Sequence, residues 1–386
     1  MIYLDNNATT RLLPEVLAAM MPYFGELYGN PSSIHLFAEQ SREALRQSRV
    51  AVGRLIGSRP EEIVFTSGAT EACNLAIFGA AAARPERRHI VVSSVEHHAV
   101  LHPIERLRVQ GYEVTVLPVS STGRLTAAEV AAALRDDTLL VATMLANNET
   151  GVIFPIAEMA AAAKARGALL LCDATQAVGK IPVHARRLGV DYLALSAHKF
   201  HGPKGVGALV VRRGAPIVAQ LVGGGQQWDI RSGTENVPGI VGMGMASYLA
   251  RRRLEEGAYG AVEALRDRLE QAILANIDRV VVNGGGEPRL PTTLNVSFED
   301  SSGEAMLQLL DEVEIAASSS SACQSNVKEP SHVLTALGLS ERYLHGSIRF
   351  GLSLLTTDDE VDELLARLPR IVARGRAAST ERGAEA

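Results

Sequence analysis

Short apolar runs alternate with helical patterns through the middle of the chain, from about residue 62 to residue 211. The runs are rich in Val, Leu and Ile and are too short for helices, so each one predicts a buried strand. Strands that alternate with helices in this way predict a mostly parallel sheet that helices cover on both faces. The predicted strands span residues 63–66, 90–93, 114–117, 139–143, 169–172, 192–195 and 207–211, and the helices between them span residues 71–83, 99–110, 127–134 and 156–165.

Two further stretches of pattern follow this region. Helical patterns rich in Arg and Glu extend over residues 246–277. A second alternation of strands and helices then extends over residues 292–368, which predicts a smaller α/β unit. Its strands are expected at residues 293–298, 313–316 and 347–351.

These patterns divide the chain into two predicted domains. A large α/β domain is expected over residues 15–258, and a smaller domain combines residues 1–14 with residues 259–374. The chain is long enough to bury two cores. Residues 375–386 have no apolar period, so we expect a disordered tail there.

A lysine and an aspartate stand at the ends of two predicted strands. Lys199 closes the sequence Ser196-Ala197-His198-Lys199, and Asp173 ends the apolar run before it along the chain. Burial lowers the pKa of a lysine and leaves a free amine, which can form a Schiff base with an aldehyde. A carboxylate at a neighbouring strand end can keep a pyridine nitrogen protonated, so the pair fits pyridoxal phosphate. A surface lysine is the alternative, and the paired strand ends favour the cofactor.

Four other residues are candidates for ligand contacts, and three of them, Thr70, His97 and Asn148, follow predicted strands at the carboxyl ends where ligands bind. Thr70 follows a strand and opens a helix, which suits a phosphate cradle or an ordinary capped helix. His97 could stack on a ring or cap a helix, and Asn148 could bond a ligand or only form a turn. Arg349, within a strand pattern, could grip a carboxylate or form a structural salt bridge. On the residues alone, these alternatives stay open.

Composition and charge narrow the class of protein. The 386 residues are 47% hydrophobic and 21% charged, as in an ordinary soluble protein. A net charge of −5 gives no electrostatic reason to expect nucleic acid or an anionic membrane as a partner. We see no signal-peptide pattern and no apolar run long enough to span a bilayer, so we expect a cytoplasmic protein.

The three cysteines differ in their surroundings. Their small and odd number suits a reducing compartment. Cys73 and Cys172 stand in apolar helix and strand patterns, so we expect buried and inert thiols. Cys323 stands among serines and other polar residues, where access favours reactivity. We therefore expect Cys323 to be the reactive thiol.

Taken together, these residues resemble the cysteine desulfurases, which are pyridoxal phosphate enzymes of fold type I. The resemblance covers almost the whole chain, and the segment around Cys323 is similar to the long-loop group. It is closest to the desulfurases of iron–sulfur cluster assembly, including the nitrogenase-associated type. The motifs are Tyr3-Leu4-Asp5-Asn6-Asn7-Ala8-Thr9-Thr10, Gly29-Asn30-Pro31-Ser32-Ser33, Ser67-Gly68-Ala69-Thr70-Glu71, Glu96-His97, Asn147-Asn148-Glu149, Asp173-Ala174-Thr175-Gln176-Ala177, Ser196-Ala197-His198-Lys199, Arg231-Ser232-Gly233-Thr234, Glu329-Pro330-Ser331-His332 and Thr356-Thr357-Asp358-Asp359-Glu360.

The resemblance implies a fold, a reaction and partners. The large domain would bind pyridoxal phosphate on a mostly parallel seven-stranded sheet, and the smaller domain would carry the cysteine loop. The reaction would convert L-cysteine to L-alanine and leave the sulfur on Cys323 as a persulfide. The sulfur would pass to an acceptor such as an iron–sulfur scaffold protein. The active unit would be a homodimer, with no nucleic acid, membrane or metal ligands involved.

The resemblance also implies a role for each site residue. Lys199 would bind the cofactor covalently and move the substrate proton, Asp173 would pair with the pyridine nitrogen, and His97 would stack on the ring and assist proton transfer. Gln176 would contact the ring hydroxyl, and Asn148 and Arg349 would bind the substrate carboxylate. Thr234 would contact the phosphate bound by the neighbouring subunit. The phosphate of the same subunit would be held by Ala69, Thr70, Ser196 and His198.

Three alternatives stay open at this point. Another aminotransferase of this fold needs the same Lys, Asp and Arg but no thiol on a polar segment, so Cys323 discriminates against it. A selenocysteine lyase would use the same machinery. A non-catalytic assembly scaffold would be expected to lose Lys199 or Cys323, and both are present. Ser320 stands where the family usually has glycine, and Gln324 stands where threonine is common. The dynamics of the segment around Cys323 and its choice of sulfur acceptor therefore stay open.

Overall fold

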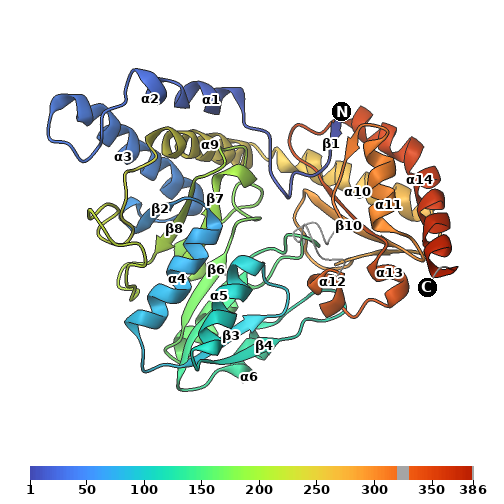
Figure 1. The fold of residues 1–386 in the computed structure, drawn as a ribbon, viewed down its shortest axis with the longest axis horizontal. Coiled ribbons are helices and arrows are strands. Elements are labelled where there is room, and N and C mark those ends of the chain that lie inside the picture. The colour runs from blue at the N-terminus through green and yellow to red at the C-terminus, as the bar shows by residue number, and fades with distance from the viewer. Residues whose placement is uncertain (320–329, 385–386) are drawn as a thin grey trace.

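A computed structural model describes residues 1–319 and 330–384, with side chains described as far as residue 379. The chain folds into two units, each built around its own sheet (Figure 1). The larger unit holds a seven-stranded sheet in the order β2-β8-β7-β6-β5-β3-β4. Its strands are β2 (Ile63–Thr66), β3 (His89–Ser93), β4 (Glu113–Leu117), β5 (Thr138–Met144), β6 (Leu169–Asp173), β7 (Tyr192–Ser196) and β8 (Gly207–Val211).

The sheet confirms the predicted fold class. β8 is antiparallel to β2 and β7, and the other neighbouring strands are parallel. All seven predicted strands are present, each within one residue of its predicted bounds. The apolar runs are therefore strands of one mostly parallel sheet.

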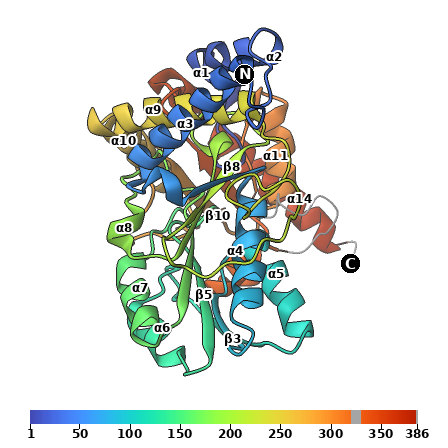
Figure 2. The same cartoon turned by 90° about the vertical axis from the view of Figure 1, so that its left-hand side faces the viewer.

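Alternate residues of the strands pack into two different cores. In β3, Val91 belongs to one core, whereas Ile90 and Val92 belong to the other. Successive side chains of a strand point to opposite faces, so both faces of this sheet are buried, and its strands are continuous apolar runs. Helices cover the two faces (Figure 2): α4 (Ala69–Ala83) and α5 (His98–Val109) lie on one, and α6 (Ala127–Ala133), α7 (Ile156–Ala165) and α8 (Ala185–Leu188) on the other.

The N-terminal helices have no counterpart among the predicted elements. They are α1 (Pro14–Met20), α2 (Pro22–Gly25) and α3 (Leu36–Ile56), followed by a short 3₁₀ turn, Pro60–Glu62. α3 crosses α9 (Val237–Glu255) at one end of the larger unit (Figure 2). A Cβ atom on Gly244 of α9 would lie 2.7 Å from the Cα of Ser48, so glycine allows the two helices to approach this closely.

The smaller unit combines the beginning and the end of the chain. Its antiparallel sheet has the order β12 (Ser347–Gly351), β10 (Thr293–Phe298) and β9 (Val280–Val282). β1 (Ile2–Tyr3) pairs in parallel with β11 (Ile315–Ala316), and Leu4 is buried in the core of this unit. Its helices are α10 (Tyr259–Asn276), α11 (Gly303–Asp311), α13 (Glu341–Leu344) and α14 (Asp358–Ala384), while α12 (His332–Ala336) packs Val333 into the core of the larger unit.

The end of the chain differs from the expected disordered tail. Helix α14 continues as far as Ala384. The backbone oxygen of Gly375 accepts a hydrogen bond from the Ser302 N–H at 3.1 Å, and Arg376 Nη1 lies 2.7 Å from Asp278 Oδ1. These contacts are polar and long in sequence separation, so the apolar period did not reveal them. Among the described residues, no helix is long and apolar enough to cross a bilayer.

Candidate active site

A cavity of about 640 Å³ lies at the carboxyl ends of the strands, where the larger sheet meets the smaller unit. Its size is within the usual range of small-molecule sites. Residues from both ends of the chain, such as Asp5 and Arg349, help to enclose it. Ten predicted site residues line this cavity: Ala69, Thr70, His97, Asn148, Asp173, Gln176, Ser196, His198, Lys199 and Arg349.

The N-terminus of α4 opens into one end of the cavity. The helix begins at Ala69, two residues before its predicted start, and its N-cap residue is Gly68, which has no side chain to cap the helix. The first N–H groups of a helix have no partner within it and attract anions. Thr70 lies in this first turn, and Ser196 lines the same cavity. The arrangement fits a phosphate group.

Lys199 extends into the cavity from the 3₁₀ turn Ala197–Lys199 that follows β7. Its Nζ donates hydrogen bonds to the backbone oxygens of Asn7 at 2.5 Å and Ala8 at 2.8 Å. Next to it, burial and the positive charge of Lys199 lower the pKa of His198 to about 4. His198 is therefore neutral at pH 7.

Asp173 is the last residue of β6 and is buried at the base of the cavity. Its Oδ1 accepts a hydrogen bond from the Thr175 N–H at 2.9 Å. Below it, burial and the nearby Asp173 charge raise the pKa of Glu96 to about 8, so Glu96 is mostly protonated at pH 7. Glu96 therefore adds little negative charge beside the carboxylate of Asp173.

His97 is the N-cap residue of α5, and its Nδ1 accepts a hydrogen bond from the Ala99 N–H at 3.0 Å. Burial is the largest cause that lowers the pKa of this imidazole. A neutral ring whose Nδ1 accepts must carry its proton on Nε2. The cap is therefore present, and because the ring also lines the cavity, the cap does not exclude a contact between His97 and a bound ring.

The two adjacent asparagines after β5 make different contacts. Asn147 Oδ1 accepts hydrogen bonds from the N–H groups of Glu149 and Thr150, each at 2.9 Å, and this forms the turn. Asn148 lines the cavity. Its backbone oxygen accepts from Asn7 Nδ2 at 3.1 Å. Asn147 therefore forms the turn, and the turn leaves Asn148 at the cavity.

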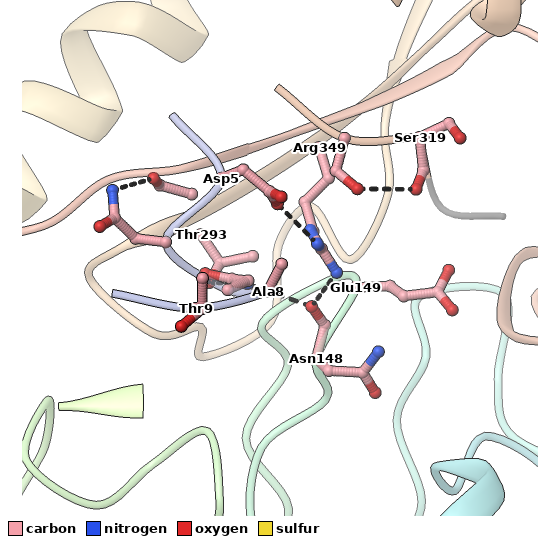
Figure 3. Close-up of polar contacts among 12 residues, drawn as sticks. Asp5, Ala8, Thr9, Asn148, Glu149, Thr293, Ser319 and Arg349 are labelled. Carbon is pink, nitrogen blue, oxygen red and sulfur yellow. Dashed lines mark hydrogen bonds and ion pairs between the residues drawn. The ribbon is translucent and has the colours of Figure 1, made fainter. Parts of the chain in front are cut away.

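Arg349 of β12 is buried and lines the cavity. Its guanidinium lies between Asp5 and Asn148 (Figure 3). Nη2 lies 3.0 Å from Asp5 Oδ1, and Nη1 donates to the Asn148 backbone oxygen at 3.1 Å. Among the described residues, Nε is buried without a hydrogen-bond partner. A donor held in this way can still bind a carboxylate, so the salt bridge to Asp5 and the predicted carboxylate grip are compatible.

Thr234 does not line this cavity, and its side chain is exposed in the single chain. The neighbouring Arg231 pairs with Glu71 of α4, with Nε 2.6 Å from Oε1. The segment that carries Arg231 and Thr234 therefore contacts the beginning of α4 through Arg231.

The two cysteines that the structure describes are buried, as the sequence predicts. Cys73 and Cys172 are fully buried, and burial raises the pKa of both thiols well above the usual value. Cys323 lies outside the described residues, as do Ser320 and Gln324. Before that segment, Ser318 lines the cavity and forms an antiparallel β-bridge with Arg349. After it, Ser331 Oγ donates a hydrogen bond to Glu149 Oε2 at 2.5 Å.

Sequence reasoning missed several polar residues of this region, among them Asp5, Asn7 and Lys180. Asp5 and Asn7 line the cavity from the N-terminal segment, and Lys180 is buried behind Gln176. The motif that begins at Tyr3 was a signal for the first two. No periodic pattern in the sequence indicates that Lys180 is buried or that it contacts Gln176, because both depend on the tertiary structure.

Comparisons with known proteins agree with this geometry. Residues 2–364 match the family described as aminotransferase class-V. The chain is 50% identical to cysteine desulfurase 2 of Trichormus variabilis, over 98% of this chain and 94% of that protein. It is 46% identical to the cysteine desulfurase NifS of Azotobacter vinelandii, over 97% of this chain and 93% of that protein. A solved structure named NifS-like protein superposes with a TM-score of 0.90 at 38% identity, over 96% of this chain and 99% of that one.

Proposed function

Because the chain belongs to the aminotransferase class-V family, we propose that the cavity at the sheet edge is the active site of its cysteine desulfurase reaction. The enzyme uses pyridoxal phosphate and converts L-cysteine to L-alanine. One observation carries the assignment of the site: Lys199, Asp173 and the N-terminus of α4 face one cavity. These three supply an amine, a carboxylate and an anion site, which the aldehyde, the ring nitrogen and the phosphate of the cofactor require.

The described residues fit this cofactor. Ser196, Thr70 and the first N–H groups of α4 would hold the phosphate, together with Ala69 and His198. Asp173 would keep the ring nitrogen protonated, which makes the ring an acceptor of electrons from the substrate. His97 would stack on the ring, and Gln176 would donate to the ring oxygen. Lys199 would bind the aldehyde and, once the substrate displaces it, move a proton at the substrate Cα.

Arg349 and Asn148 would hold the carboxylate of L-cysteine. Arg349 has a buried Nε without a partner among the described residues, and its guanidinium is fixed by Asp5 and the Asn148 oxygen. A planar guanidinium can bind a carboxylate with two parallel hydrogen bonds, which a lysine cannot reproduce. The orientation of this one side chain therefore sets the orientation of the substrate.

Replacing Arg349 with lysine is expected to raise KM for L-cysteine by about a hundredfold, with a smaller change in kcat. Steady-state kinetics of alanine formation measure this split. Arg342→Lys is the matched control, because Arg342 is an exposed arginine paired with Asp300 in the same unit. An unchanged KM in Arg349→Lys would show that another group binds the carboxylate.

Cys323 would receive the sulfur. The thiolate attacks the substrate sulfur, so that an S–S bond forms at Cys323 while the Cβ–S bond breaks. Cys73 and Cys172 are unsuited, since burial keeps their thiols protonated. Ser318 lines the cavity five residues before Cys323, and five extended residues span at most about 17 Å. The chain length therefore allows Cys323 to reach the substrate.

We propose that the active unit is a homodimer. Large apolar side chains are exposed along α1 to α3 and in the segment that precedes Thr234, and such patches mark association surfaces. These two sets of apolar side chains lie on adjacent segments, because the Arg49 guanidinium of α3 lies 4.3 Å from the ring centre of Trp228. The exposed residues are Leu17, Met21, Phe24, Tyr28, Ile34, Leu36, Phe37, Leu221, Val222 and Trp228.

In such a dimer, Thr234 would contact the phosphate bound by the partner subunit. Thr234→Ala is expected to weaken cofactor binding about tenfold, the effect of one lost hydrogen bond to a charged group. Mixed dimers test the direction of the contact. A Thr234→Ala subunit paired with a Lys199→Ala subunit has one site that keeps Lys199, and the affinity of that site for the cofactor is measured. Wild-type affinity would mean that Thr234 acts across the interface, and an affinity about tenfold weaker would mean that Thr234 serves its own subunit.

The sulfur acceptor would be an iron–sulfur scaffold protein, and the location cytoplasmic. The similarity to a desulfurase named NifS supports this acceptor class. Cys73 and Cys172 are free thiols, and a persulfide enzyme needs a reducing compartment. Incubation with ³⁵S-cysteine should label a purified scaffold protein faster than an unrelated thiol protein. Equal labelling of both would contradict a dedicated scaffold acceptor.

A further inference from the structure

A lysine is enclosed directly behind the cavity. Lys180 is only 4% exposed, and its Nζ donates to Gln176 Oε1 at 2.8 Å, its one side-chain hydrogen bond among the described residues. Burial, aided by the positive charges of Lys199 and Arg349, lowers the pKa of Lys180 to about 7. A buried cation without a carboxylate is costly, and an apolar side chain of similar length would avoid that cost. Packing alone therefore does not explain a lysine at this position.

The backbone after β6 places Lys180 beside Gln176. Two successive turns reverse the chain: the Val178 N–H donates to the Ala174 oxygen at 3.0 Å, and the Lys180 N–H donates to the Ala177 oxygen at 3.1 Å. Gly179 lies between them with a φ of 80°, and a Cβ atom there would lie 2.6 Å from Phe200 Cβ. The turn therefore requires glycine, and it directs the lysine amine back toward residue 176.

Gln176 has its two polar atoms on different partners. Oε1 accepts from Lys180, and Nε2 donates to the Asn7 backbone oxygen at 2.9 Å. Lys199 donates to the same Asn7 oxygen. Nε2 carries two hydrogens, so one is left for an acceptor in the cavity that Gln176 lines. If the amide flipped, its NH₂ group would face the lysine amine and its oxygen would face the Asn7 oxygen.

We propose that Lys180 is a positioning residue, which holds Gln176 with its amide N–H toward the ring oxygen of pyridoxal phosphate. The inference rests on the proposed contact between Gln176 and that oxygen. While Lys180 is protonated, its positive charge at Oε1 also polarises the amide and strengthens its N–H as a donor. Both effects stabilise the anionic form of the ring oxygen, and they act through Gln176.

The test is a pH titration of the visible absorbance of the bound cofactor, in wild-type holoenzyme and in Lys180→Met. The deprotonated form carries one more negative charge, so loss of the donor chain should move the midpoint up by about one pH unit. The melting temperature should not fall, since methionine fills the space without burying a charge. If Lys180→Met fails to hold the cofactor, Lys180→Gln takes its place, and an unchanged midpoint there overturns the proposal.

Two controls separate this role from its alternatives. Lys204 also lines the cavity, so Lys204→Met removes a positive charge near the cofactor and should shift the midpoint less. An equal shift would mean that charge alone matters. In the Gln176→Ala background, adding Lys180→Met should change nothing further. An unchanged midpoint in Gln176→Ala would reject the proposed contact of Gln176 and the inference with it. A shift in Gln176→Ala without one in Lys180→Met would reject only the role of Lys180.

Discussion

Replacing Lys199 with alanine is expected to lower cysteine desulfurase activity by at least about a thousandfold, because the variant lacks the amine that binds the cofactor aldehyde and moves the substrate proton. The Lys199 amine is held at the cavity by the Asn7 and Ala8 oxygens, 2.5 and 2.8 Å away. Its removal costs these two hydrogen bonds, about 1–3 kcal/mol of stability, so the variant should still fold.

Borohydride reduction of the wild-type holoenzyme, followed by peptide mapping, should leave the cofactor label on Lys199. Lys204→Ala is the matched control, since Lys204 is an exposed lysine that lines the same cavity. That variant should keep the covalent label. A label on Lys204 or on any other lysine would contradict the assignment.

Replacing Cys323 with serine is expected to abolish sulfide release from L-cysteine while the visible absorbance of the bound cofactor stays intact. The cofactor contacts proposed for Asp173 and Lys199 do not depend on Cys323, whereas a serine hydroxyl cannot act as the sulfur nucleophile. The reaction should stop after the substrate proton is removed, so a new absorbance should develop when L-cysteine is added.

Stopped-flow absorbance and assays of alanine and sulfide measure these effects. Cys73→Ala is the control, because Cys73 is a core residue with a protonated thiol, and it should release sulfide at the wild-type rate. If Cys323→Ser still forms alanine at a comparable rate, another group removes the sulfur, and an aminotransferase-like course gains support. With selenocysteine as the substrate, the same variant shows whether that reaction also needs the thiol.

The sequence by itself determined the larger sheet and most of the candidate site. A strand buried on both faces must be apolar throughout, so β3, β5, β6 and β7 are visible in the chain without any tertiary information. The carboxyl ends of parallel strands meet at one edge, so polar residues such as Asp173 and Lys199 at those ends could be assigned to one cavity. The cysteine environments could also be predicted, because Cys73 and Cys172 stand within apolar patterns.

Only the tertiary structure decided which polar residues act together across long sequence separations. Asp5 meets Arg349 at the cavity, 344 residues away in sequence, and Arg376 holds the end of α14 against Asp278. Lys180 reads as an ordinary surface lysine until its burial behind Gln176 is known. Hydrophobic periodicity records which side of an element faces the core, and it carries no information on the partner of a polar side chain. That partner is fixed by the packing of the units, and so it appeared only in the folded chain.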